Sequence, residues 1–272
     1  MTFARRRFRN ALVFLLAVVV ALMIFQVLKL TLLVQQYYSG WLLVFIMIVL
    51  LLFGVKKRLS ILPLGSNAAW AQLHYYLGLF LIVIFLIHIE FSLPNGAVEV
   101  ALTCLLIVVV TVGIIGLIIS RLYAKRLSQL GEEVIYERIP VLRSKLKNTL
   151  ESQLLESVER SKSSTLSTYY LEKLSPYFAT QHDFLANIVG NNFQRKKRRS
   201  ELEQQLRYLS KDEAHFAIQM LVFLEQKYIL DCHSALQGVL KFWSLLHVPI
   251  ALLTGGVAIF HIVLVYAFRG AM

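Results

Sequence analysis

Five apolar runs constrain this chain more than any other feature of its sequence. As helices of about twenty residues, they can each cross the roughly 30 Å of hydrocarbon in a bilayer. Only helices and closed barrels satisfy all backbone hydrogen bonds in that medium. The sequence therefore predicts an all-α fold, a polytopic membrane bundle of five transmembrane helices. The runs lie near residues 11–34, 37–55, 69–91, 97–120 and 240–268.

The placement of the basic residues predicts which way these helices cross. Arginines precede the first run, a Lys-Lys-Arg cluster joins the second to the third, and more follow the fourth. The short loops 35–36 and 92–96 have no Lys or Arg. Because positive charge favours the cytoplasmic side, we expect a multi-pass protein of the bacterial inner (cytoplasmic) membrane. Its N-terminus would be cytoplasmic and its C-terminus periplasmic.

These spans divide the chain into three parts. Residues 1–121 hold transmembrane helices one to four, residues 122–238 form a helical cytoplasmic insert, and residues 239–272 hold the fifth transmembrane helix. The insert has 17 basic and 14 acidic residues, so the net charge of +12 needs no nucleic acid to explain it. Neither GxGxxG nor GxxxxGK[ST] occurs in the sequence, which argues against a dinucleotide site or a P-loop. We expect helices over 140–160, 165–179, 195–209 and 211–228.

Two of the membrane helices carry histidines at matched spacing. His74 and His88 lie fourteen residues apart in the third span, and so do His247 and His261 in the fifth. Fourteen residues advance about 21 Å, close to four whole turns, so each pair lies on roughly one face of its helix. Both helices begin in the cytoplasm under the charge assignment and are therefore parallel. This places His74 level with His247, and His88 level with His261.

Other residues on these helices fit a cofactor between them. Gly78 lies on the histidine stripe and leaves room for a broad ring. Gly113 and Gly116 of span four allow close approach of a helix or of a cofactor edge, and helix packing is the commoner cause. Pro249 removes a hydrogen bond just after His247 and permits a bend. Basic residues near the cytoplasmic ends are candidate partners for cofactor carboxylates: Lys56, Lys57, Arg58 and Lys241.

The stretches LHYYLGLFLIVIFLIH and LHVPIALLTGGVAIFH resemble the ligand helices of bis-histidine dihaem b-type membrane cytochromes. Their placement on the third and fifth spans is similar to the cytochrome b and ferric-reductase-like transmembrane group. The resemblance implies two b-type haems, with His74, His88, His247 and His261 as axial ligands of the iron. The pairs would be His74 with His247 and His88 with His261. Two imidazoles on each iron leave no open position, which favours electron transfer over oxygen chemistry.

The chain also departs from that group, since it has no flavin or NADPH module and carries a large insert. We therefore expect an electron-transfer subunit of an oxidoreductase complex rather than a complete enzyme. It would carry electrons between a quinone pool or cytoplasmic donor and an outer-side acceptor. Expected partners are membrane lipid and redox protein subunits at the insert and the outer face, and quinone is a further candidate ligand.

Two other functions stay open at this stage. A membrane sensor or scaffold would signal through the helical insert, because the fourth span continues directly into the basic segment 121–138. A metal transporter would use the histidines for ions, although the remaining spans offer few polar ligands. The basic run 195–199 is typical of a solvated helix start or a lipid contact, and docking of an acidic partner is the alternative.

Overall fold

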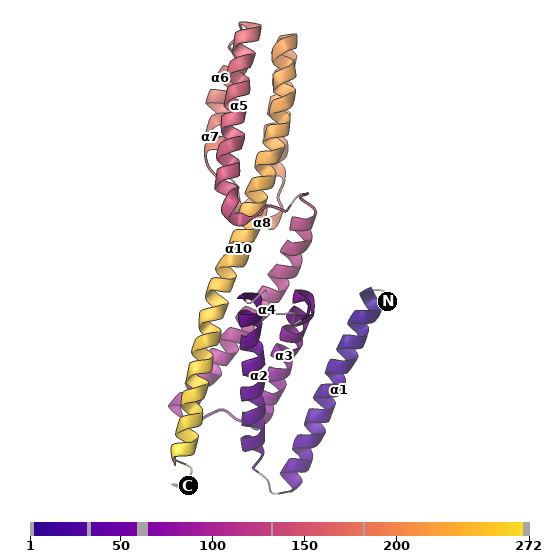
Figure 1. Cartoon of the computed structure of the whole chain (residues 1–272), viewed down its shortest axis with the longest axis vertical. Coiled ribbons are helices and arrows are strands. Elements are labelled where there is room, and N and C mark those ends of the chain that lie inside the picture. The colour runs from indigo at the N-terminus through magenta and orange to yellow at the C-terminus, as the bar shows by residue number, and fades with distance from the viewer. Residues whose placement is uncertain (1–2, 32–33, 59–64, 132, 182, 269–272) are drawn as a thin grey trace. The chain divides into compact units, whose positions relative to one another are not determined.

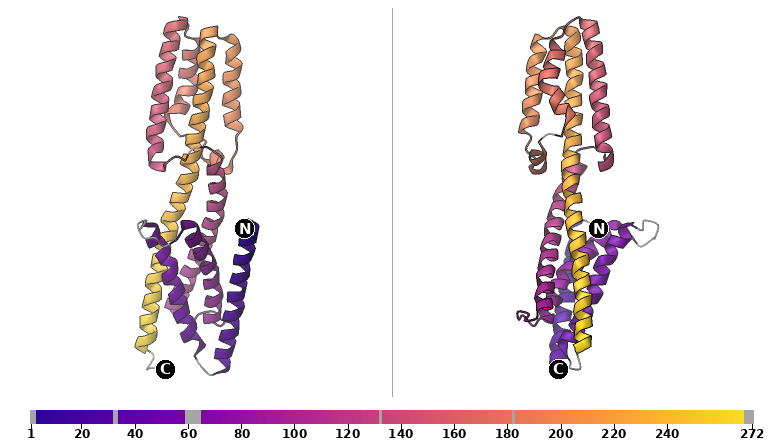
Figure 2. Two further views of the ribbon diagram at one scale, coloured as in Figure 1. Left: turned by 45° about the vertical axis from the view of Figure 1, so that its right-hand side comes forward. Right: turned by 90° about the vertical axis from the view of Figure 1, so that its left-hand side faces the viewer.

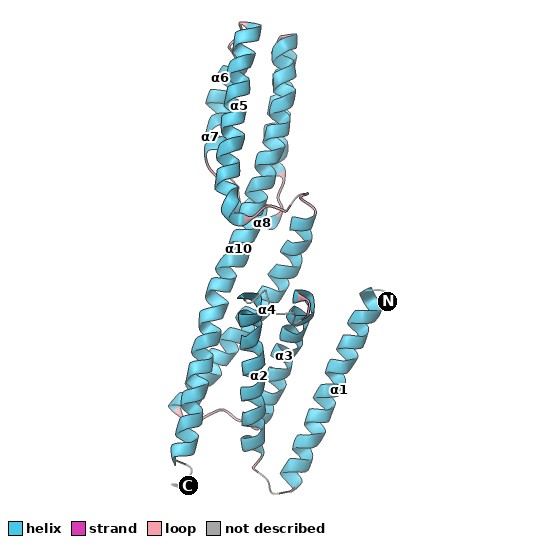
Figure 3. Ribbon diagram, viewed as in Figure 1, coloured by secondary structure: helices cyan, strands magenta, loops and turns pink. Residues whose placement is uncertain are grey.

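The computed structural model describes residues 3–31, 34–58, 65–131, 133–181 and 183–268. Within these ranges every regular element is a helix and no strand occurs (Figure 3). The chain forms two compact units. The first consists of Met1–Leu117 with Leu245–Met272, and the second is Ile118–Ser244. The all-α prediction is confirmed.

The first unit holds the apolar helices. They are α1 (Phe3–Leu30), α2 (Gln35–Arg58), α3 (Asn67–His88), α4 (Ala97–Ser128) and the last part of α10 (Lys211–Phe268). Each of these five helices contains a stretch long and apolar enough to cross a membrane, which confirms the prediction of a multi-pass chain. The loop expected over residues 35–36 was wrong, because both residues already belong to α2.

The core of the first unit is built by α1 to α4. Helices α2 and α3 lie side by side (Figures 1 and 2). Among the described residues, the hydrophobic core of these four helices contains no residue of α10, although Thr254 of α10 is buried. Contacts between α10 and the other helices of this unit are instead made by particular side chains, such as the Tyr266 hydroxyl with Trp41 and Tyr37. The buried core residues are Ala21, Phe25, Ile46, Leu81, Ile84, Ile87 and Leu106.

Polar contacts hold the N-terminal end of α3 in place. Ser66 is its N-cap, and its hydroxyl accepts a hydrogen bond from the Ala69 amide, as its position predicts. Lys56, buried at the end of α2, donates to the Gly65 carbonyl and to the Asn67 side chain. The N-terminal end of α3, from which His74 projects two turns later, is therefore anchored to α2.

The second unit is a bundle of shorter helices around the first part of α10 (Figure 2). Pro140 opens α5 (Ile139–Ser161), as predicted. The predicted helix 165–179 is present as α6 (Thr165–Tyr169) and α7 (Ser175–Ala179), joined by a π-helical turn. The remaining helices are α8 (Phe184–Val189), which the sequence did not indicate, and α9 (Phe193–Gln205). Buried core residues include Leu150, Leu166, Tyr170, Phe178, Leu202 and Met220.

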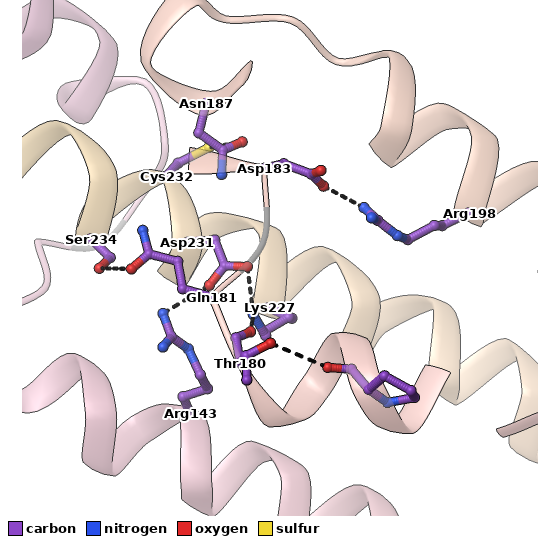
Figure 4. A network of polar contacts seen from close by, with 11 residues as sticks. Arg143, Thr180, Gln181, Asp183, Asn187, Arg198, Lys227, Asp231, Cys232 and Ser234 are labelled. Carbon is purple, nitrogen blue, oxygen red and sulfur yellow. Dashed lines mark hydrogen bonds and ion pairs between the residues drawn. The ribbon is translucent and has the colours of Figure 1, made fainter. Parts of the chain in front are cut away.

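A buried ionic network joins α10 to the rest of this unit (Figure 4). Lys227 and Asp231 are almost fully enclosed and form an ion pair one turn apart on α10. Asp231 also accepts from Arg143 of α5 at 2.9 Å, and Lys227 donates to the Thr180 carbonyl at 2.9 Å. Tyr177 lies beside Lys227, and burial together with the Asp231 carboxylate raises the pKa of its hydroxyl. Helices α5, α7 and α10 therefore share one charged centre.

Helix α10 is a single uninterrupted element of 58 residues. The expectation of a separate helix ending near Tyr228 was wrong, because the helix continues to Phe268. Pro249 lies inside it without ending it. At about 1.5 Å per residue the helix is far longer than a bilayer is thick, so only its apolar C-terminal part can form the span.

The basic run at the start of α9 is largely paired within the second unit. Arg195 bonds to Glu225, and Arg198 bonds to Asp183. Further pairs, Lys197 with Glu201 and Arg199 with Glu203, lie one turn apart on the helix surface. Four of the five basic side chains of the run 195–199 therefore have acidic partners within the second unit.

Candidate cofactor site

The imidazoles of His74 and His247 lie close together in the first unit, one edge-on to the other. Their ring centroids lie 6.4 Å apart, with the ring planes at 76°. Helix α3 contributes one ring and α10 the other. Phe53 of α2 packs against His74 with centroids 5.1 Å apart, which closes one side of the pair. Two segments far apart in sequence thus bring two imidazole side chains together inside an apolar bundle.

The separation of these rings fits a shared metal ion. An imidazole nitrogen binds a metal such as zinc at about 2.0–2.1 Å, and a ring centre lies about 1.2 Å further out, so two rings across one ion are about 6.4 Å apart. The distance between the His74 and His247 centroids is 6.4 Å. Nδ1 of His74 is enclosed and makes no hydrogen bond within the described residues, although the Leu50 backbone lies near the ring.

The second pair lies at the other end of the same two helices. His88 and His261 are close enough to interact electrostatically. Nδ1 of His88 lies 3.0 Å from the hydroxyl oxygen of Ser39, which comes from α2. Since His74 meets His247 and His88 meets His261, α3 and the last part of α10 run in the same direction, as the charge pattern predicted.

Glycines make room at both pairs. A Cβ atom at Gly113 of α4 would lie 3.4 Å from Cε1 of His247, and one at Gly40 of α2 would lie 3.2 Å from Cε1 of His88. Gly78, on the histidine stripe of α3, is different. A Cβ atom there would meet no heavy atom within 4 Å among the described residues outside its own helix backbone. Space for a larger group therefore exists one turn from His74.

Replacing Gly78 tests whether that space belongs to a cofactor. If the His74 pair holds a haem, as the sequence resemblance implies, Gly78→Leu should lower the haem content of the chain, because the leucine would fill the space beside the ring. Gly54→Leu is the control, since Gly54 also has open surroundings but lies off the stripe. Haem content per purified chain is the measurement. Equal haem in both variants and the unchanged protein would mean that the space beside Gly78 holds no cofactor.

Two of the four basic side chains considered for cofactor carboxylates have partners within the protein. Lys56 bonds to Gly65 and Asn67, and Lys241 bonds to Glu137 and lies over the Tyr136 ring. The side chains of Lys57 and Arg58 lie outside the described part of the chain. The structure therefore gives Lys56 and Lys241 a structural role.

The other two described histidines, His215 and His233, belong to the second unit. His215 contacts Gln219 on the surface of the second unit, and His233 is buried against Gln237; His182 lies outside the described residues. Within the described ranges no three or more His, Cys, Asp or Glu side chains gather to hold a metal ion.

Sequence reasoning did not identify Ser39 or Gly40 as part of this site. Both lie at the start of α2, a helix that was expected only to pack against the histidine helices. A small polar residue next to a glycine at the edge of an apolar span was the available signal. Comparisons with known protein families, with characterised proteins and with solved structures give no match.

Proposed function

We propose that this chain is a dihaem cytochrome b-type subunit that carries electrons across the bacterial inner membrane. Its donor would be a quinone pool or a cytoplasmic reductant and its acceptor would lie on the outer side, within a larger complex. The N-terminus and the second unit would be cytoplasmic. The geometry of the His74–His247 pair carries the proposal, because two imidazoles 6.4 Å apart suit one iron between parallel helices of matched spacing.

Each side chain has a specific role in this arrangement. His74 and His247 would hold one b-type haem, and His88 with His261 would hold the other. When bound, a haem with two imidazole ligands supplies one-electron transfer and has no open position for oxygen. Gly40 and Gly113 let the backbones of α2 and α4 approach the rings. The apolar side chains of the bundle exclude water from both pairs.

Electron transfer through the chain tests this proposal directly. Protein reconstituted into vesicles that enclose ferricyanide should speed the loss of ferricyanide when dithionite is added outside. His247→Leu should slow the reaction to the rate of protein-free vesicles, because one of the two electron carriers is missing. His215→Leu, which changes a surface histidine of the second unit, is the control and should keep the full rate. A haem-containing protein that gives no acceleration would contradict the proposed transmembrane path.

One observation favours a second candidate function, a sensor or scaffold. Helix α10 connects the second unit to the membrane span without a break, and α4 extends from the membrane into the second unit to Ser128. Continuous helices of this kind can transmit a change in the span to the cytoplasmic side. A purified chain without haem, whose second unit changes protease sensitivity on addition of a ligand, would favour this function over electron transfer.

A further inference from the structure

The Ser39 hydroxyl lies within hydrogen-bond distance of Nδ1 of His88, one of the paired histidines of α3. Ser39 is 0% exposed, and its oxygen lies 3.0 Å from Nδ1 of His88. The same oxygen lies 2.9 Å from the Gln35 carbonyl and 3.2 Å from the Gln36 carbonyl. These contacts together decide which atom carries each proton.

A serine hydroxyl has one proton to donate and can accept through its lone pairs. The carbonyl of Gln35 is only an acceptor, so its 2.9 Å contact with Ser39 requires the serine proton. The hydroxyl oxygen then has lone pairs but no further proton for His88. The 3.0 Å contact must therefore use a proton on Nδ1 of His88. In a neutral imidazole the other nitrogen, Nε2, is then unprotonated.

We propose that Ser39 is the positioning residue of the outer haem: it holds His88 as the Nδ1–H tautomer and thereby presents Nε2 to the iron. This inference rests on the proposed function. A hydrogen bond on the remote N–H fixes the ring orientation and raises the basicity of a ligating imidazole. A more basic ligand favours oxidised over reduced iron, so this contact should lower the potential of that haem.

The surroundings of Ser39 hold the contact in place. Gln35 lies in the first turn of α2, and its side chain donates a hydrogen bond to the Ile87 carbonyl at the end of α3, at 3.0 Å. The Gln36 amide donates to the Glu90 carboxylate at 2.5 Å. Gly40 lies against the His88 ring. Ser39 and Gly40 therefore contact the His88 ring itself, and the two glutamine side chains bond to the adjacent end of α3. Among the described contacts His74 has no corresponding hydroxyl partner.

Redox titration of Ser39→Ala in the full chain tests the inference. Alanine has nearly the same size and removes only the hydroxyl, so we expect a raised midpoint potential and about tenfold weaker retention for one haem alone. Each tenfold change in the relative affinity for oxidised and reduced iron is about 59 mV for one electron. The haem of the His74 pair is the internal control. Ser39→Thr retains a hydroxyl that can bond the same carbonyl and should restore the unmodified values.

The possible results separate this inference from the proposed function. A shift confined to one haem and reversed by Ser39→Thr supports it. Haem present with both potentials unchanged in Ser39→Ala would overturn the role of Ser39 and leave the proposed function standing. Equal shifts of both haems would also overturn it, since they indicate a general change of the bundle. A wild-type chain without haem would overturn both proposals.

Discussion

Replacing His88 with leucine is expected to reduce the purified chain from two haems to one, and replacing His261 should remove the same haem. Each substitution takes away one of two axial ligands, and the opposite imidazole alone holds the group weakly. His74→Leu and His247→Leu should each remove the other haem. Haem content and the redox titration of the remaining haem are the measurements.

Double variants test the pairing. His88→Leu combined with His261→Leu should retain one haem, because both residues serve the same group. His88→Leu combined with His247→Leu should retain none, since each pair has lost a ligand. The surface residue His215 provides the control, and His215→Leu should keep two haems. Two haems in both double variants, or one haem in both, would contradict the pairing that the structure indicates.

Asp231→Leu is expected to destabilise the second unit by about 3–5 kcal/mol, the usual cost of breaking a buried ion pair. Lys227 would remain buried with its charge uncompensated, and Arg143 would lose its carboxylate partner. Lys227→Met combined with Asp231→Leu should recover much of the loss, because well-packed apolar side chains often replace a buried pair without cost.

Pulse proteolysis of the full chain in increasing urea would measure this effect. The protease should cut Asp231→Leu within residues 118–244 at a lower urea concentration than the unchanged protein. Glu203→Gln, which breaks a surface pair with Arg199, should leave the midpoint unchanged because exposed pairs contribute little. A midpoint for Asp231→Leu equal to that of Glu203→Gln would show that the buried network does not stabilise the unit.

The sequence was sufficient for the fold class and for the presence of the five apolar helices. Apolar length is a direct consequence of bilayer thickness, so the five spans follow from composition. Local chemistry also located particular ends: Ser66 caps α3, and Pro140 opens α5. Such signals depend on a few neighbouring residues, which is why they can be interpreted without the fold.

The continuity of α10 was missed for a physical reason. Hydropathy changes near residue 240, where the helix enters apolar surroundings, but a change of solvent does not end a helix. No proline lies between Lys211 and Trp243, and Gly238 alone does not break the hydrogen-bond ladder. The start of α2 was missed because two glutamines at an apolar border were interpreted as a loop.

The candidate site was only partly accessible to sequence reasoning. The four histidines stood out because two fourteen-residue spacings repeat on separate helices. Ser39 gave no comparable signal, since its meaning depends on α2 lying beside the end of α3. Lys56 and Lys241 were considered for cofactor contacts because of their position in sequence, and in the structure they have partners in the protein. Contacts between helices decide such roles.

The haem content of the wild-type chain tests the central claim most directly. The full chain, purified from a haem-replete host, should be converted to its pyridine haemochrome and compared with protein determined by amino-acid analysis. The account predicts b-type haem at about two per chain, with a low-spin reducible spectrum that matches two imidazole ligands on each iron. A colourless, iron-free protein that remains folded would contradict it.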